Sequence, residues 1–197
     1  MIRHPHVTAA VLAGGRATRL GGAVKTLLPL SGPEDTPLSR LLAMARGRFP
    51  RCLVIAPDPA PFAAHDVTVV PDRVPGLGPL GGIEAALAAA GTPRVIVLGG
   101  DMPSVSGDLV DWMVARARSD RPLVPRRAGR PEPLHAIYPV SILPALRAAL
   151  RENVRKIGDL FVRIPVDFVD EVLYGAIEGA DRSFDNINTP DDLEVLR

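Results

Sequence analysis

The sequence lacks several features that mark particular classes of protein. Its 197 residues include one cysteine, Cys52, so an internal disulfide framework is excluded. The charges nearly cancel, with 23 basic against 22 acidic residues, which argues against a nucleic-acid-coating protein. No apolar run reaches the ~20 residues that span a bilayer, and no signal peptide is recognisable. These absences predict one cytoplasmic domain over residues 1–197, with no membrane or nucleic-acid partner.

Lysine is the scarcest of the common charged residues. Only two of the 23 basic residues are lysine, Lys25 and Lys156. A lysine ammonium is a compact point charge, and it is not interchangeable with the planar guanidinium of arginine. We therefore regard a lysine retained in such an arginine-rich chain as a candidate functional residue.

Short apolar runs alternate with helical patterns along the chain. Strands are expected at 7–12, 51–56, 67–70, 94–98, 122–125 and 136–138, with an edge strand at Val162–Val166. Helices are expected at 37–48, 83–90 (after Gly81 and Gly82), 109–118 and 141–150, with a last one starting at Thr189–Pro190. Continuous apolar strands between helices predict an α/β fold whose mostly parallel sheet is covered on both faces. Ligands of such folds bind at the carboxyl ends of the strands.

The loop after the first strand, Leu12–Lys25, is rich in glycine and basic residues. Gly14 and Gly15 allow close approach of the backbone to a ligand, and successive N–H groups in such a turn bind anions. Arg16, Arg19 and Lys25 add positive charge. This pattern predicts a phosphate-binding loop, although the Walker A spacing is absent. The alternative is an ordinary glycine-rich turn.

The segment Gly76–Gly81 matches the GxGxxG pattern of dinucleotide-binding loops, with Asp101 about 20 residues further on. On this basis an NAD(P)-binding oxidoreductase is a possible function of a different class. Asp72–Pro75 separates the preceding strand from the first glycine, and Pro79 lacks an N–H that could face a phosphate. The alternatives are recognition of a nucleotide base by this loop, or a simple turn before a helix.

Two polar clusters follow later in the chain. Asp101 comes directly after an apolar strand and two glycines, where its carboxylate would suit Mg²⁺; the alternative is a helix cap. Asp185, Asn186 and Asn188 offer a carboxylate and two amides beside a predicted helix start, where capping is an equal alternative. His135 lies in a predicted strand and is expected to be a core histidine.

Taken in order, these motifs resemble those of a known family. The segments LAGG, RLGG with the following lysine, GLGPLGGI, GDMP, PEPLHAIY and NINTPDDL run from Leu12 to Leu193. Together they resemble the MobA-like nucleotidyltransferases, and among these the molybdenum cofactor guanylyltransferases. The resemblance implies a Rossmann-like three-layer αβα fold with a mixed, mostly parallel sheet, of the nucleotide-diphospho-sugar transferase type.

The resemblance also implies a reaction and its residues. GMP would pass from GTP to the phosphate of the molybdopterin cofactor, with Mg²⁺ bound to Asp101 and pyrophosphate released. Other cofactor-biosynthesis proteins or apo-molybdoenzymes are implied as possible partners. By the family pattern, Lys25, Arg19 and Asp101 serve catalysis, and Asn186 and Asn188 lie on the acceptor side. The implied nucleotide-binding residues are Leu12, Ala13, Gly14, Gly15, Lys25, Asp72, Gly78, Pro79, Leu80 and Asp101.

The chain departs from the family pattern at two points. The loop lysine commonly follows an aspartate, where this chain has Val24, and an asparagine commonly follows the second strand, where it has Ala56 and Pro57. The identity of the nucleotide is therefore open, and a transferase that uses CTP or another phosphorylated acceptor is the nearest alternative. A non-catalytic nucleotide sensor on the same fold is a third.

Overall fold

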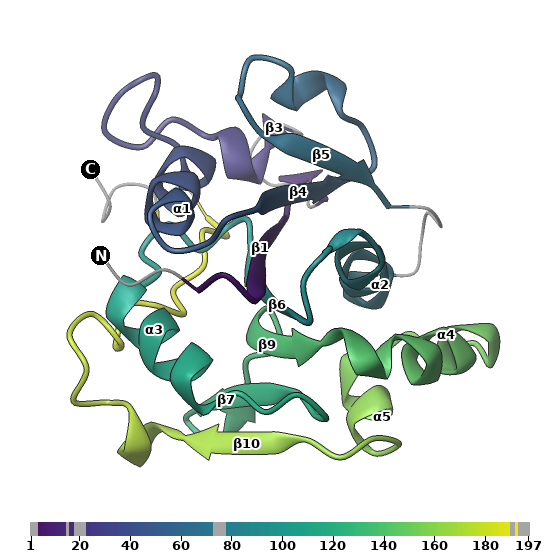
Figure 1. Cartoon of the computed structure of the whole chain (residues 1–197). Helices are drawn as coiled ribbons and strands as arrows, with labels where there is room; N and C mark the ends of the chain where they lie inside the picture. Colours follow the sequence, from purple (N-terminus) through teal and green to yellow (C-terminus); the bar gives the residue numbers. More distant parts are fainter. Residues whose placement is uncertain (1–3, 15, 18–22, 73–77, 190–191, 193–197) are drawn as a thin grey trace.

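The structure is a computed structural model that describes residues 4–14, 16–17, 23–72, 78–189 and 192. Its centre is an eight-stranded sheet of order β10-β7-β9-β6-β1-β4-β5, with the short β8 paired to β7 (Figure 1). The strands are β1 (Val7–Leu12), β4 (Cys52–Ala56), β5 (Thr68–Pro71), β6 (Arg94–Gly99), β7 (Leu123–Arg127), β8 (Arg130–Pro131), β9 (His135–Pro139) and β10 (Asp167–Asp170). A separate antiparallel ribbon joins β2 (Arg16–Ala17) to β3 (Ala23–Val24).

The sheet has a parallel half and a mixed half. Strands β6, β1, β4 and β5 are parallel, so their carboxyl ends lie at one edge of the sheet, with Leu12 level with Ile55 and Gly99. Strand β9 runs antiparallel to β6 and β7, and β10 is parallel to β7. The predicted α/β class with a mostly parallel, mixed sheet is confirmed.

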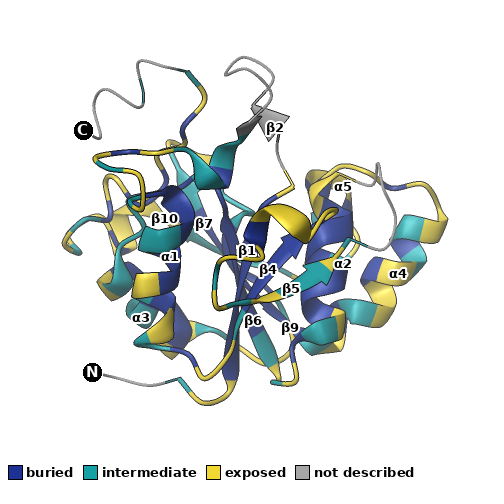
Figure 2. Ribbon diagram, turned by 90° about the horizontal axis from the view of Figure 1, so that it is seen from above, coloured by how far each residue is buried: buried dark blue, intermediate teal, exposed yellow. Residues whose placement is uncertain are grey.

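Helices cover both faces of this sheet (Figure 2). On one face α1 and α3 pack against β1 and β6, and on the other α2, α4 and α5 form the second core. The helices are α1 (Pro37–Arg46), α2 (Pro79–Ala89), α3 (Gly107–Arg116), α4 (Leu143–Arg151) and α5 (Ile157–Phe161). Short 3₁₀ turns occur at Lys25–Leu27, Ala60–Phe62, Val140–Ile142 and Glu171–Leu173. Because helices lie on both sides, the central strands β1 and β6 are apolar apart from Thr8 and the first residue of β6, Arg94.

Local sequence explains where the helices of the first layer begin. Thr36 and Ser39 form a reciprocal capping box at the start of α1, with Pro37 at the first helical position. Ser106 caps α3 by accepting a hydrogen bond from the Leu109 N–H at 3.3 Å. Asp101 is therefore not the cap of this helix.

Two predicted elements are wrong. Residues Val162–Val166 form no strand, and the edge strand is β10. Pro165 cannot donate a backbone hydrogen bond, and the ladder begins only where the Asp167 N–H donates to the Pro122 carbonyl at 2.8 Å. The second helix does not open after Gly81 and Gly82, because Pro79 already stands in its first turn.

The remaining differences are small. The helix expected from Ser141 starts as the 3₁₀ turn Val140–Ile142 and continues as α4. The last predicted helix falls mainly on residues 190–191 and 193–197, which lie outside the described residues. Among the helices of the described chain, none combines the length and the apolar character needed to cross a bilayer.

Candidate active site

A cavity of about 530 Å³ opens at the carboxyl edge of the parallel strands. Its walls come from the ends of β1, β4 and β6, from the start of α2 and from the turn after β3. The lining residues are Leu12, Gly14, Lys25, Thr26, Ile55, Pro57, Asp72, Gly78, Pro79, Gly82, Gly99, Asp101 and Leu134. Among the described residues, the cavity wall is thus mainly backbone and apolar surface, with one cation and two acids.

Lys25 and Asp101 face each other across this cavity. The Lys25 ammonium lies 3.7 Å from Oδ2 of Asp101, and their side chains are 20% and 29% exposed. Lys25 also donates a hydrogen bond of 2.8 Å to Oδ1 of Asn188, which stands 163 positions away in the sequence. One ammonium is therefore held between a carboxylate at a strand end and an amide from the C-terminal segment.

Gly100 keeps the Asp101 turn pressed against β1. Its N–H donates to the Leu12 carbonyl at 2.9 Å. A Cβ at this position would lie 2.4 Å from Oγ1 of the buried Thr26 and 2.7 Å from the Leu12 carbonyl oxygen. Only glycine allows this approach, and the approach fixes where Asp101 enters the cavity.

Another part of the cavity wall is formed by the start of α2. Gly78 precedes this helix with a φ of 61°, in the left-handed region that favours glycine. Pro79 follows at the first helical position, and both residues line the cavity. This part offers backbone and a flat apolar surface, which suits the edge and face of a nucleotide base.

A second cavity of about 350 Å³ lies beside the first. The two cavities meet at the bond between Lys25 and Asn188, because Lys25 lines the first and Asn188 the second. The lining residues of the second cavity are Arg127, Glu132, Phe184, Asp185, Asn186, Asn188 and Asp192. In contrast to the first cavity, most of its wall is polar or charged side chain.

Asp192 orients the Asn188 backbone. Its Oδ2 accepts hydrogen bonds from the N–H groups of Asn188 and Thr189 at 2.7 and 2.8 Å. These two backbone N–H groups are the main reason that the pKa of Asp192 is lowered, with smaller contributions from the Thr189 hydroxyl and the charge of Lys25. Asp192 thus fixes the backbone of Asn188, and Lys25 fixes its side chain.

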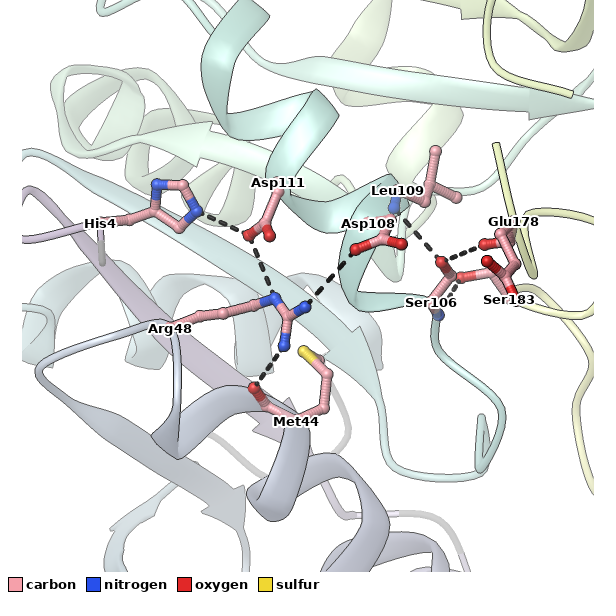
Figure 3. A network of polar contacts seen from close by, with 9 residues as sticks. All are labelled: His4, Met44, Arg48, Ser106, Asp108, Leu109, Asp111, Glu178 and Ser183. Atoms are coloured by element: carbon pink, nitrogen blue, oxygen red, sulfur yellow. Dashed lines mark hydrogen bonds and ion pairs between the residues drawn. The ribbon is translucent and has the colours of Figure 1, made fainter. Parts of the chain in front are cut away.

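Side-chain hydrogen bonds join the C-terminal segment to the start of α3 (Figure 3). The buried Ser183 accepts from the Ser106 N–H at 2.9 Å, and the Ser106 hydroxyl donates to the Glu178 carbonyl at 2.6 Å. Figure 3 also shows Arg48 donating to Asp111 at 3.1 Å, which ties the end of α1 to α3. The segment that carries Asn188 is therefore anchored to the same layer as the Asp101 turn.

His135 holds the same segment from the sheet. Its Nδ1 donates to the Ser183 carbonyl at 3.1 Å, and its ring lies 4.6 Å from that of Phe184. Burial lowers the pKa of His135 to about 4, so the ring is neutral at physiological pH. Its Nε2 has no hydrogen-bond partner among the described residues. His135 is a core histidine, as predicted.

The predicted site residues fall into four groups. Those that line the first cavity are Leu12, Gly14, Lys25, Asp72, Gly78, Pro79 and Asp101. Asn186 and Asn188 line the second cavity. Ala13 and Leu80 are buried behind the first, with the Ala13 N–H donating to the Ile55 carbonyl at 2.8 Å. Gly15 and Arg19 lie outside the described residues.

Three neighbours of the site were not predicted. Thr26 lines the first cavity and packs against Gly100, and only its position next to Lys25 could have indicated it. Glu132 lines the second cavity within the PEPLHAIY segment, where no local pattern marks it. Ser183 is buried beside His135, and nothing in the sequence connects the two residues.

Comparison with known proteins identifies the family. Residues 9–163 match the model of the MobA-like NTP transferase domain. The chain belongs to this family. It is 38% identical over 204 residues to the molybdenum cofactor guanylyltransferase of Mesorhizobium japonicum, covering 95% of this chain and 92% of that protein. Asn186 and Asn188 lie beyond the part that matches the family model.

Solved structures agree with the fold. The crystal structure of molybdopterin-guanine dinucleotide biosynthesis protein A from Archaeoglobus fulgidus superposes with a TM-score of 0.82 at 27% identity, and 96% of each chain is covered. A Mycobacterium tuberculosis protein in complex with manganese has a TM-score of 0.64 at 22% identity, with 97% of each chain covered. The chain is thus a nucleotidyltransferase-family protein with the predicted fold.

Proposed function

We propose that this chain transfers GMP from GTP to the terminal phosphate of the molybdopterin cofactor and releases pyrophosphate. The activity is that in the name of the M. japonicum relative, which the chain matches along nearly its whole length. The observation that carries the proposal is the position of Lys25. Its ammonium stands between Asp101 and Asn188, where a cavity suited to a nucleotide meets a second, polar cavity.

This arrangement suggests how the two substrates lie. The base of GTP would occupy the part of the first cavity near Gly78 and Pro79, with Asp72 beside it, so that its phosphates extend toward Lys25 and Asp101. The molybdopterin phosphate would enter from the second cavity beside Asn186 and Asn188. The reacting phosphates would then meet at the boundary of the two cavities.

The site also suits a divalent cation. No group of three or more acidic, histidine or cysteine side chains in the described parts of the chain is arranged to hold a metal ion by itself. A cation would therefore be shared between the Asp101 carboxylate and phosphate oxygens of the nucleotide, and such hard oxygen ligands suit Mg²⁺. When bound, Mg²⁺ would neutralise phosphate charge as a Lewis acid.

The reaction needs little acid–base chemistry. An oxygen of the acceptor phosphate attacks the α-phosphorus of GTP and forms a new P–O bond, while the bond from that phosphorus to the pyrophosphate oxygen breaks. The attacking phosphate is already anionic, so no side chain has to remove a proton. Lys25, together with Arg19, would offset the negative charge that builds on the phosphoryl oxygens, and alignment of the two phosphates supplies much of the rate.

The test is product analysis with each of the four nucleotides. The protein is incubated with molybdenum-loaded molybdopterin, Mg²⁺ and ATP, CTP, GTP or UTP, and the products are identified by mass spectrometry. We expect a guanine dinucleotide of the cofactor together with pyrophosphate, and Lys25→Ala as the inactive control.

Other products would select one of the alternatives. Formation of a cytosine dinucleotide would show that CTP is the nucleotide substrate, consistent with the unusual residues Val24, Ala56 and Pro57. Binding of NADH without binding of GTP would favour the oxidoreductase. Binding of GTP without pyrophosphate release for any acceptor would favour a nucleotide sensor.

A further inference from the structure

Glu132 is held rigidly at the wall of the second cavity. It lies in the connection between β8 and β9, where its N–H donates to the Pro125 carbonyl at 2.8 Å. Its own carbonyl accepts from the His135 N–H at 3.1 Å. The backbone is thus fixed on both sides, and the side chain is half-buried and lines the cavity.

The Glu132 carboxylate has no hydrogen-bond donor within the described chain. The nearest cation of the cavity, Arg127, donates instead to Oδ1 of Asp185 at 2.8 Å and to the Asp181 carbonyl at 3.1 Å. Burial raises the pKa of Glu132, and the charge of Arg127 opposes this only in part. A half-buried carboxylate without a protein donor depends on solvent, and a ligand that supplies N–H groups would replace this solvent with direct, charge-assisted hydrogen bonds.

The two oxygens of a carboxylate match a pair of parallel N–H donors. The 2-amino-pyrimidin-4-one edge presents such a pair, an exocyclic amine beside a ring N–H. Both the pterin of the acceptor and the guanine of GTP carry this edge. Glu132 lines the second cavity together with Asn188, whereas Gly78 and Pro79, which offer the surface suited to a base, line the first.

We propose that Glu132 recognises the aminopyrimidinone edge of the pterin and so selects the acceptor. The inference rests on the proposed function, because it takes the acceptor to be a pterin. The other acids of the cavity are already engaged: Asp185 with Arg127, and Asp192 with the Asn188 and Thr189 N–H groups. Among the described acids of this wall, Glu132 is therefore the one available to a ligand.

The test uses a fluorescent pterin that has no phosphate and no molybdenum. 6-Hydroxymethylpterin is titrated into the full-length protein while its fluorescence is followed. Loss of a charge-assisted pair of hydrogen bonds corresponds to a loss in affinity of about tenfold or more, which is expected for Glu132→Leu. Glu132→Gln has nearly the same shape and keeps one acceptor oxygen, so an intermediate loss is expected.

Glu152→Gln is the matched control, because it removes a glutamate charge outside both cavities, at an exposed carboxylate already bonded to Arg163. We expect it to leave pterin affinity within about twofold of wild type, since its carboxylate is not offered to the ligand. Circular dichroism establishes that each variant is folded. In the transfer assay, Glu132→Gln should raise KM for the acceptor and leave KM for GTP unchanged.

Three results would overturn the proposal. Pterin binding could be absent in wild type, equal in wild type and both Glu132 variants, or reduced equally by Glu152→Gln. Guanosine is titrated in parallel. If the Glu132 variants lose affinity for guanosine alone, Glu132 recognises the base of the nucleotide and not the pterin. If pterin binding required Glu132 but no GMP transfer occurred with any acceptor, the proposed function would fail while the recognition stood.

Discussion

The two cavities that meet at Lys25 are built in different ways. The first is formed by the ends of parallel strands, and its wall is mainly backbone, glycine and apolar side chain. The second is formed by the β7–β9 region and the segment after residue 180, and its wall is mainly charged and amide side chains. The first owes its shape to the sheet itself, whereas the second depends on a few side-chain hydrogen bonds from Ser106, Ser183 and His135.

This difference suggests that the two cavities have different roles. A site made from strand ends and glycines can change little without disturbing the sheet, which suits a part common to many nucleotidyltransferases. A site made from side chains on a segment without regular structure can change its specificity at low cost to the fold. We therefore expect substitutions to affect chemistry most strongly at the first cavity, and acceptor binding or local stability at the second.

Asp101→Ala should have the largest effect on activity. It removes the carboxylate that lies 3.7 Å from the Lys25 ammonium after β6, and with it the proposed cation ligand. The expected loss in kcat is more than about 10³-fold with a folded protein, because charge stabilisation in a water-poor site is a large part of such catalysis. Pyrophosphate release measures the effect. Wild-type turnover with Mg²⁺ would contradict the assignment, and pterin binding should persist in the variant.

Lys25→Ala is expected to come next. Loss of one preorganised positive group at a developing charge costs about 2–4 kcal/mol of transition-state stabilisation, or about 10²–10³-fold in kcat. Because Lys25 also holds Asn188, the KM for the acceptor should rise as well. Lys156→Ala is the matched control, since it changes the only other lysine of the chain. Equal kinetics in both variants would exclude Lys25 from the reaction.

His135 should make the second region sensitive to acid. Its pKa is lowered to about 4 in the folded chain, whereas an unfolded histidine titrates near 6.5. The unfolded state therefore binds the extra proton, and stability that is complete above about pH 6.5 is lost as the pH falls toward 4.

Within that range this residue should lower the free energy of unfolding by up to about 1.4 kcal/mol per pH unit. Urea unfolding of wild type and His135→Asn, which keeps a donor but does not titrate there, measures the difference. The exposed His6→Gln serves as the control. Parallel pH profiles of wild type and His135→Asn would contradict the prediction.

Ser183→Ala should have the smallest effect. It leaves the Ser106 N–H without its acceptor, and because this bond is only partly buried the expected cost is about 1 kcal/mol of stability. The KM for GTP should stay the same and that for the acceptor should rise, because the altered contact supports only the second cavity. Ser141→Ala, an exposed serine that donates to the Ser119 carbonyl at 2.9 Å, is the control. A rise in both KM values would show that the two cavities are not independent.

The sequence predicts the first region far better than the second. The apolar runs around β1 and β6 mark buried strands directly, and motifs placed at strand ends then come together because parallel strands end at one edge. Lys25 and Asp101 were assigned to one site in this way, and they are 3.7 Å apart. The register and direction of the strands bring these motifs together, and both follow from the local sequence pattern.

The second region depends on contacts that no local pattern encodes. The hydrogen bond between His135 and Ser183 joins residues 48 positions apart, and that between Ser106 and Ser183 joins residues 77 positions apart. Even the edge strand was misplaced, because β10 carries Asp167 and Asp170 and faces Arg118, Arg121 and Arg126. At a sheet edge, charge pairing replaced the apolar periodicity on which the prediction relied.

The bond from Lys25 to Asn188 has a consequence for synthesis of the protein on the ribosome. Residue 188 is synthesised 163 positions after residue 25, and β10 ends at Asp170, so a nascent chain can complete its sheet before the partner of its lysine has left the exit tunnel. Such a chain lacks the bond at which the two cavities meet, and the proposed transfer would begin only once Asn188 has emerged.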